Sequence, residues 1–204
     1  ESYKKIAIER GGMKPEDVFV LRSGPKLERL KIQEPKNEIK RGKKFMVGYL
    51  GVIGQQEGIE YLLKAAKYIK ELPGRNDVFW GIVGGGPDVE HMKKLSHDMG
   101  LDDIVEFTGR VPDQTLLDYL NTADVCVNSD EYNAMNDKST MNKVLEYMAL
   151  GKPLVQFDLT EGRYSAQEAS LYAKRNDAED MAKKILELLD NPEKRKQMGE
   201  YGRN

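Results

Sequence analysis

The feature that most constrains the fold is a regular alternation of short apolar runs with longer amphipathic segments. Residues 45–51, "FMVGYLG", form an apolar run, and "GIEYLLKAAKYIKEL" follows with apolar residues at helical spacing. The same alternation continues through "DVFWGIV", "IVEFTG", "DVCVNS", "PLVQFD" and "SLYA". Apolar strands that alternate with helices are typical of parallel sheets covered on both faces. The sequence therefore predicts an α/β fold with a doubly wound, Rossmann-like parallel sheet.

The composition is that of a soluble globular protein. The chain has 204 residues, of which 32% are charged and 39% apolar, and its net charge is −2. This charge gives no basic field of the kind that nucleic acid requires. The single cysteine, Cys126, lies in an apolar run and cannot form an internal disulfide, which favours a core residue and a reducing cytoplasm. No apolar run is long enough to span a bilayer.

The first 44 residues are predicted to differ from the rest. The chain starts at Glu1 within a helical pattern, "SYKKIAIERGG", so we expect a piece of a longer protein. Residues 17–24, "DVFVLRSG", are predicted to form a short strand, and the lysine-rich residues 25–44 a connecting loop. We therefore divide the chain into a junction and linker, 1–44, and a sheet-forming domain, 45–204.

In open parallel sheets, ligands bind where the strands end at their carboxyl edge. Gly51 and Gly54 follow the first long strand and open a helix, which suits either close approach of an anion or a plain turn. Gly84 and Gly85 follow the next strand and allow the same two interpretations. Arg110, after the third, is suited to stacking on a base or pairing with phosphate, and equally to solvent.

The helix in residues 139–151, "STMNKVLEYMALG", has its apolar residues at helical spacing. These residues are Met141, Val144, Leu145, Met148 and Ala149. We expect this stripe to pack on the sheet, and Gly151 followed by Pro153 to end the helix.

Polar side chains lie off this stripe near the start of the same helix. Asn142 and Glu146 are one turn apart, so both point to one place. Asp137 or Ser139 is expected to cap the helix. A plainer interpretation is a solvated helix with an exposed Lys143–Glu146 pair, and the residues alone leave both open.

Four motifs together resemble a known family. "GVIGQQEGIEYLLKAA", "FWGIVGGGPDVEHMKKL", "VEFTGRVPDQTLLDYLNTADVCVN" and "STMNKVLEYMALGKPLVQFD" resemble, in content and order, the C-terminal half of group 1 (family 4) GT-B glycosyltransferases. The resemblance implies that residues 45–204 bind a nucleotide-sugar donor. It also implies that an N-terminal domain, absent here, holds most of the acceptor site, so that this chain alone is not expected to be active.

Two departures from the family pattern concern charged residues. Glu146 matches the second glutamate of the Glu-x7-Glu motif, which in relatives bonds the ribose, but the first position holds Lys138. The two positions where relatives hold the diphosphate with arginine and lysine are here Val52 and Glu57. We expect Lys143 to take over this role, with Lys138 and Arg163 as other available cations.

The candidate residues for binding the nucleotide and sugar are Gly51, Gly54, Gly84, Gly85, Arg110, Asp137, Lys138, Ser139, Thr140, Asn142, Lys143, Glu146 and Arg163. No catalytic residue is assigned within this domain. Asp137 is also considered as a partial replacement for the missing first glutamate.

The implied reaction is transfer of a sugar with retention of its anomeric configuration, without a metal or cofactor. The two histidines, His91 and His97, lack metal-binding spacing, and no pyridoxal phosphate site is recognisable. The alternatives are a non-catalytic nucleotide-sugar-binding or regulatory module and a nucleotide-sugar epimerase.

The expected partners are the nucleotide-sugar and a glycan or lipid-linked acceptor, as in polysaccharide biosynthesis. Basic residues gather in the linker: Lys36, Lys40, Arg41, Lys43 and Lys44. They suit contact with anionic lipid headgroups on the cytoplasmic side of a membrane, or simply a solvated linker, which we favour.

Overall fold

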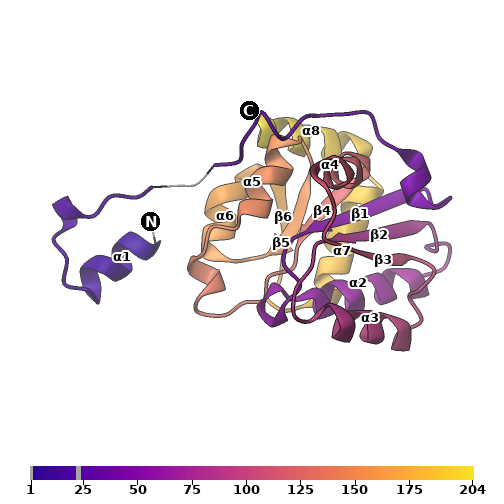
Figure 1. Cartoon of the computed structure of the whole chain (residues 1–204), viewed down its shortest axis with the longest axis horizontal. Coiled ribbons are helices and arrows are strands. Elements are labelled where there is room, and N and C mark those ends of the chain that lie inside the picture. Colours follow the sequence, from indigo (N-terminus) through magenta and orange to yellow (C-terminus); the bar gives the residue numbers. More distant parts are fainter. Residues whose placement is uncertain (1, 22–23) are drawn as a thin grey trace.

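The computed structural model describes residues 2–21 and 24–204 and contains a six-stranded sheet in the order β3-β2-β1-β4-β5-β6 (Figure 1). The strands are β1 (Phe45–Leu50), β2 (Val78–Val83), β3 (Val105–Gly109), β4 (Val125–Asn128), β5 (Leu154–Phe157) and β6 (Ser170–Ala173). Every neighbouring pair is parallel. The predicted doubly wound α/β fold is confirmed.

Helices cover both faces of this sheet. The α-helices are α1 (Ser2–Glu9), α2 (Ile59–Glu71), α3 (Val89–Asp98), α4 (Asp113–Thr122), α5 (Asn142–Ala149), α6 (Thr160–Ala166), α7 (Ala178–Leu189) and α8 (Pro192–Arg203). Short 3-10 turns are η1 (Pro15–Asp17), η2 (Asn37–Lys40), η3 (Gln55–Glu57), η4 (Asn136–Lys138) and η5 (Gln167–Ala169). Helices α2, α3 and α7 pack on one face, and α4 and α5 on the other (Figure 1). Within the described ranges, no helix is both long and apolar enough to cross a membrane.

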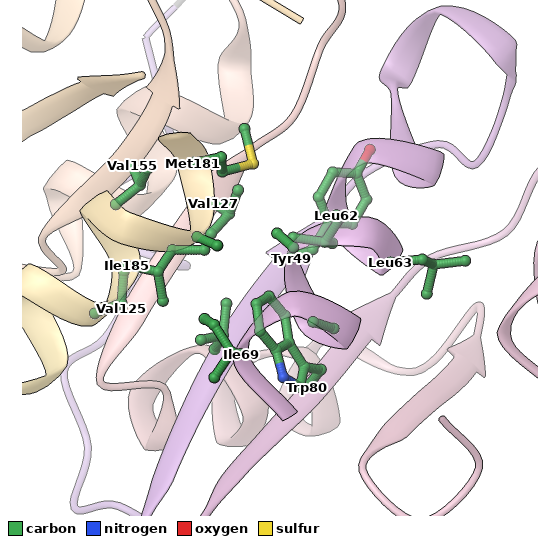
Figure 2. Packing of buried hydrophobic residues seen from close by; sticks show 14 of the residues in the cluster. Tyr49, Leu62, Leu63, Ile69, Trp80, Val125, Val127, Val155, Met181 and Ile185 are labelled. Carbon is green, nitrogen blue, oxygen red and sulfur yellow. The ribbon is translucent and has the colours of Figure 1, made fainter. Parts of the chain in front are cut away.

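The core consists of the apolar strands and the inward stripes of the helices. Figure 2 shows Trp80 of β2 near Ile69 of α2, with Val125 of β4 near Ile185 of α7. The opposite face of the sheet buries Cys126 completely, and burial raises the pKa of its thiol to about 12. The prediction of a core cysteine is therefore confirmed.

The strand predicted at residues 17–24 is wrong. Asp17 ends η1, and Val18–Leu21 are extended but pair with no strand among the described residues. The side chains of Phe19 and Leu21 are 81% and 94% exposed. An apolar alternation forms a strand only where a sheet edge accepts its hydrogen bonds, and no such edge lies beside these residues. Arg22 and Ser23 lie outside the described residues.

The order of the strands reverses next to β1, since β2 and β3 lie on one side of it and β4 to β6 on the other. In this architecture the crevice for ligands lies at the carboxyl ends of the two strands at the reversal. Strands β1 and β4 pair only through Val47 with Val125 and Gly48 with Cys126. The loops that follow β1 and β4 therefore border the crevice.

Gly84 is predicted to be indispensable where β2 meets this crevice. Its φ is +137°, and a Cβ there would lie 1.8 Å from the carbonyl oxygen of Gly51. Gly84→Ala should lower the free energy of unfolding by about 2–4 kcal/mol, through backbone strain and overpacking. The matched control is Gly100→Ala, with φ of +69° and open space around the new Cβ, which should cost about 1 kcal/mol. Urea denaturation measures both, and equal losses would contradict this account.

Candidate functional site

The loops after β1 and β4 are joined into one rim by hydrogen bonds. The Asn136 side-chain amide donates to the carbonyl oxygens of Gln56 and Glu131, both at 2.9 Å. The Glu131 backbone amide donates to Gln56 at 3.2 Å, and the Ser129 hydroxyl donates to the Glu57 carbonyl at 2.8 Å. Both sides of the crevice are thus held in place before any ligand arrives.

Tyr147 of α5 fixes the helix to both strands at the reversal. Its hydroxyl accepts a hydrogen bond from the Leu50 amide at 2.7 Å and donates to the Val127 carbonyl at 3.3 Å. The predicted inward stripe is therefore partly wrong: Val144 and Ala149 are buried, but Leu145 is only partly so. The buried face of α5 includes Tyr147, because the Tyr147 hydroxyl finds hydrogen-bond partners in the two strands.

A buried ion pair lies directly below the crevice. Lys143 Nζ of α5 is 2.8 Å from Asp130 Oδ1, and their side chains are 11% and 3% exposed. The ammonium also lies 5.0 Å from the centroid of the Tyr49 ring and 3.4 Å from its hydroxyl. Burial raises the pKa of Asp130, while the charge of Lys143 opposes that rise. The plainer interpretation, an exposed pair of Lys143 with Glu146, is wrong.

Close packing accounts for the glycines that face this pair. A Cβ at Gly51 would lie 2.7 Å from the Tyr49 hydroxyl and 3.2 Å from Lys143 Cε. At Gly54 it would lie 2.8 Å from a carboxylate oxygen of Glu57. Gly51 therefore leaves room for Lys143 beneath the loop, and the loop needs no ligand to explain its glycines.

Gly85 and Arg110 lie together at the ends of β2 and β3. A Cβ at Gly85 would lie 3.1 Å from Arg110 Cγ, and the arginine is exposed. The described structure brings neither residue to the Lys143–Asp130 pair. Sequence reasoning thus grouped Arg110 with residues of α5 that lie on the other side of β1.

Glu146 faces a small cavity on the outer side of α5. The cavity measures about 180 Å³ and is lined by Glu146, Asn142 and residues of the linker: Gly24, Pro25, Lys26, Arg29 and Leu30. Burial raises the pKa of the Glu146 carboxyl, and the charge of Arg29 opposes the rise. The carboxylate is thus half-buried beside open space, one turn into the helix.

Lys138, Ser139 and Thr140 line a second, larger cavity. It measures about 480 Å³, and its other wall is formed by α1 and residues 18–21. Asn142 belongs to both cavities, so the two adjoin at the start of α5. The structure therefore brings together four of the predicted site residues, three just before α5 and Asn142 at its first position.

Asp137 does not cap α5, and the prediction that it or Ser139 does so is wrong. The helix begins after Met141 without a side-chain cap. The Asp137 carboxylate instead accepts hydrogen bonds from the Thr160 amide at 2.9 Å and hydroxyl at 3.0 Å, at the start of α6. The Ser139 hydroxyl donates to the Met135 carbonyl at 2.8 Å. The amide groups of the first turn of α5 thus remain without a side-chain cap.

Arg163 is already engaged within the fold. Its Nε donates to Asp158 Oδ1 at 2.8 Å, and its guanidinium lies 4.1 Å from the centroid of the Tyr172 ring. This pairing lowers the pKa of Asp158. Arg163 is therefore held by a carboxylate, unlike the free cation that the sequence suggested.

The basic residues of the linker are also held by neighbouring groups. Lys36 lies 2.7 Å from Asp118 and Lys40 2.9 Å from Asp124. Arg41 pairs with Glu106. These contacts hold this part of the linker on the domain, an arrangement that neither interpretation, lipid contact or a solvated linker, had predicted.

Sequence reasoning did not name four of the residues that build this site: Asp130, Tyr49, Asn136 and Tyr147. Asp130 lies two residues after the end of β4, so its place at the carboxyl edge was a usable signal. Tyr49 and Tyr147 are hidden in apolar runs, where their hydroxyls leave no pattern. Within residues 2–21 and 24–204, no group of three or more His, Cys, Asp or Glu side chains is arranged to hold a metal ion.

The buried pair is predicted to be costly to break. Lys143→Ala leaves Asp130 buried without its counter-charge, so the free energy of unfolding should fall by about 3–5 kcal/mol. The matched control is Lys64→Ala on α2, which removes an exposed pair with Glu60 at 2.6 Å and should cost under about 0.5 kcal/mol. Both are measured by urea denaturation. A Lys143→Ala chain as stable as the control would refute a structural role for the pair.

Comparison with known proteins places this chain in a family. The model of "Glycosyl transferases group 1" matches residues 31–204. An uncharacterized glycosyltransferase of Haemophilus influenzae is 28% identical over 173 residues, which cover 83% of this chain and 46% of that protein.

Solved structures share the fold at low sequence identity. A glycosyltransferase from Rickettsia africae has a TM-score of 0.82 and 14% identity, covering 99% of this chain and 55% of its own. Anabaena Alr3699/HepE in complex with UDP has a TM-score of 0.80 and 16% identity, covering 98% and 55%. This chain thus spans about half the length of these proteins. It belongs to the group 1 glycosyl transferases and has the fold of the C-terminal domain of a GT-B glycosyltransferase.

Proposed function

We propose that residues 45–204 bind the nucleoside diphosphate of an activated sugar, which a complete enzyme transfers to an acceptor with retention of configuration and without a metal. The observation that carries this proposal is Glu146: a half-buried carboxylate beside the cavity of about 180 Å³ between α5 and the linker. Membership of the family supports the use of a nucleotide-sugar, and HepE, which shares the fold, was solved in complex with UDP.

The Glu146 carboxylate would accept hydrogen bonds from the ribose hydroxyls. A hydrogen bond to a charged group contributes about 1.5–3 kcal/mol when both partners leave water. Burial has already removed part of the hydration of this carboxylate, so hydroxyl groups from a ligand restore what folding took away. A role in binding ribose would explain why a partly desolvated carboxylate is kept at this position.

The leaving group is a nucleoside diphosphate, whose negative charge grows as the glycosidic bond breaks. Preorganised N–H groups stabilise such a charge without any strong acid. The first turn of α5 supplies amides without a side-chain cap and the positive end of a helix dipole. These groups are the chain's own contribution to the chemical step.

The loop after β1 offers the diphosphate little attraction. A hollow of about 490 Å³ there is lined by Val52 and Glu57, where relatives carry cations, and by Glu131 on the facing loop. No lysine or arginine lines it in the described part of the chain. This favours the α5 side of the crevice for the phosphates.

Lys143 remains a predicted contact to the diphosphate. Its ammonium is paired with Asp130, so the phosphates would have to share it with that carboxylate. The hypothesis fails if nucleoside diphosphate affinity is the same in Lys143→Met as in the parent chain, with folding of the variant verified first.

The rest of the enzyme would lie outside this chain. We propose that a separate N-terminal domain binds the acceptor, a glycan or lipid-linked glycan of cytoplasmic polysaccharide biosynthesis, and that residues 1–44 are the junction to it. The alternatives are a non-catalytic nucleotide-binding module, which the absence of cations at Val52 and Glu57 favours, and an epimerase.

Glu146→Gln should weaken nucleotide binding while making the fold slightly more stable at pH 7. The folded-state pKa of Glu146 is raised, so its stabilising protonated form is lost as the pH rises through that pKa. The neutral amide of the variant avoids this cost, and because the carboxyl is only half-buried we expect a Tm gain of about 1–2 °C. The gain in Tm should vanish at pH 3, where the parent carboxyl is also neutral. At pH 7 the affinity of Glu146→Gln for nucleosides should be about tenfold lower than that of the parent chain.

The control is Glu200→Gln, an exposed glutamate of α8, which should change neither property. Calorimetry measures the affinities and a thermal melt at pH 3 and 7 the stability. Unchanged nucleoside affinity in Glu146→Gln would remove the main support for the ribose contact.

The parent chain should be stabilised by at least one of UDP, GDP, ADP and TDP. A ligand at about 100 times its Kd adds about 2.7 kcal/mol, which corresponds to about 5–10 °C in Tm for a domain of this size. No shift with any of the four would favour a degenerate module. If a nucleotide does bind, fusing this chain to a GT-B N-terminal domain and identifying the products distinguishes a transferase from an epimerase.

A further inference from the structure

The three cations that the sequence offered for the diphosphate differ in what already neutralises them. Lys143 lies 2.8 Å from Asp130, and Arg163 lies 2.8 Å from Asp158. Lys138 has no carboxylate within ion-pair distance among residues 2–21 and 24–204. Of the three, Lys138 alone keeps its charge available.

The carboxylate next to Lys138 in the chain is turned away from it. Asp137 accepts from both the amide and the hydroxyl of Thr160, and Arg175 approaches it at 3.5 Å. Asp137 therefore holds η4 against the start of α6. The two neighbouring residues point their charges to different places, and only that of Lys138 faces the cavity of about 480 Å³.

The described residues that line that cavity carry more positive than negative charge. The charged residues among them are Lys4 of α1, Lys138 and Glu161. Glu161 is buried, and its carboxylate accepts from the Ser2 amide at 3.1 Å, the Ser2 hydroxyl at 2.6 Å and the Thr140 hydroxyl at 3.4 Å. Among the described lining residues, two ammonium groups thus face one carboxylate, which already accepts three hydrogen bonds.

The cationic cavity continues from the one that Glu146 faces. Asn142, at the start of α5, lines both. A ligand with its ribose at Glu146 would therefore extend past Asn142 and bring its next groups to Lys138. In a nucleotide-sugar these next groups are the phosphates.

We propose that Lys138, with Lys4 beside it, binds a phosphate group in the cavity of about 480 Å³, in place of the cations that this chain lacks at Val52 and Glu57. The inference rests on the proposed function for its choice of ligand. An ammonium is a compact point charge with three donors, which suits phosphate oxygens. The phosphate comes from the diphosphate of the sugar donor, or from a phosphorylated acceptor that enters the same cavity.

The test compares Lys138→Met and Lys138→Arg with the parent chain by calorimetry. The probes are uridine and UDP, their counterparts with the other bases, inorganic pyrophosphate and glucose 6-phosphate. Lys138→Met should bind nucleoside diphosphate about tenfold more weakly, with nucleoside affinity and Tm unchanged. Lys138→Arg should retain most of the affinity. The control is Lys94→Met, an exposed lysine of α3, which should change nothing.

Each outcome bears on the inference separately from the proposed function. Loss of diphosphate binding alone assigns the phosphate to the sugar donor, whereas loss of glucose 6-phosphate binding alone assigns it to a phosphorylated acceptor. If the parent chain binds no nucleotide but binds pyrophosphate through Lys138, the proposed function fails and the inference stands. If nucleotides bind and Lys138→Met alters no phosphate ligand, the inference is overturned and the proposed function stands.

Discussion

Strand β1 pairs with β4 through only two residue pairs, and the pairing ends at Gly48. The carboxyl edge of the sheet is therefore open between these two strands. Where the ladder ends, side chains take over the contacts between the strands. The Tyr147 hydroxyl links Leu50 to Val127, and Lys143 lies between Tyr49 and Asp130. Helix α5 supplies both side chains, so its position is fixed to the two strands at the point where ligands bind in this architecture.

A buried ion pair at this point is a poor choice for stability alone. Apolar side chains of similar volume often stabilise a fold as well or better, because they avoid the cost of removing two charges from water. The pair nevertheless holds the Asp130 loop and the first turn of α5 in one arrangement. Asn136 and Ser129 extend this rigidity to the loop after β1. A rim held in advance loses less conformational freedom when a ligand binds.

Much of the fold could be predicted from the sequence because it depends on local periodicity. Every strand from Phe45 onward lies in an apolar run, and helices such as α2 carry their buried residues at helical spacing. Residues 18–21 show the limit of that reasoning, since their alternation has no sheet edge to join.

The site was predicted less completely, because its contacts join residues that are distant in the chain. Asp130 and Lys143 are 13 residues apart, and Asp137 and Thr160 are 23 apart. The spacing of polar residues on α5 indicated which side chains share a face. It gave no sign that Lys143 turns inward to Asp130 or that Asp137 serves α6.

The distribution of charge around the crevice decides which side of it suits phosphate. A phosphate about 6 Å from a carboxylate is repelled by on the order of 3 kcal/mol at an effective dielectric constant of about 20. Glu57 and Glu131 impose that repulsion on the side of the β1 loop, where Val52 offers no compensation. On the other side, Asp137 and Glu161 are occupied by hydrogen bonds, and Lys138 is not neutralised by a carboxylate among the described residues. If the proposed function holds, this distribution of charge favours a diphosphate at the start of α5, near Lys138, over one in the β1 loop, near Glu57 and Glu131.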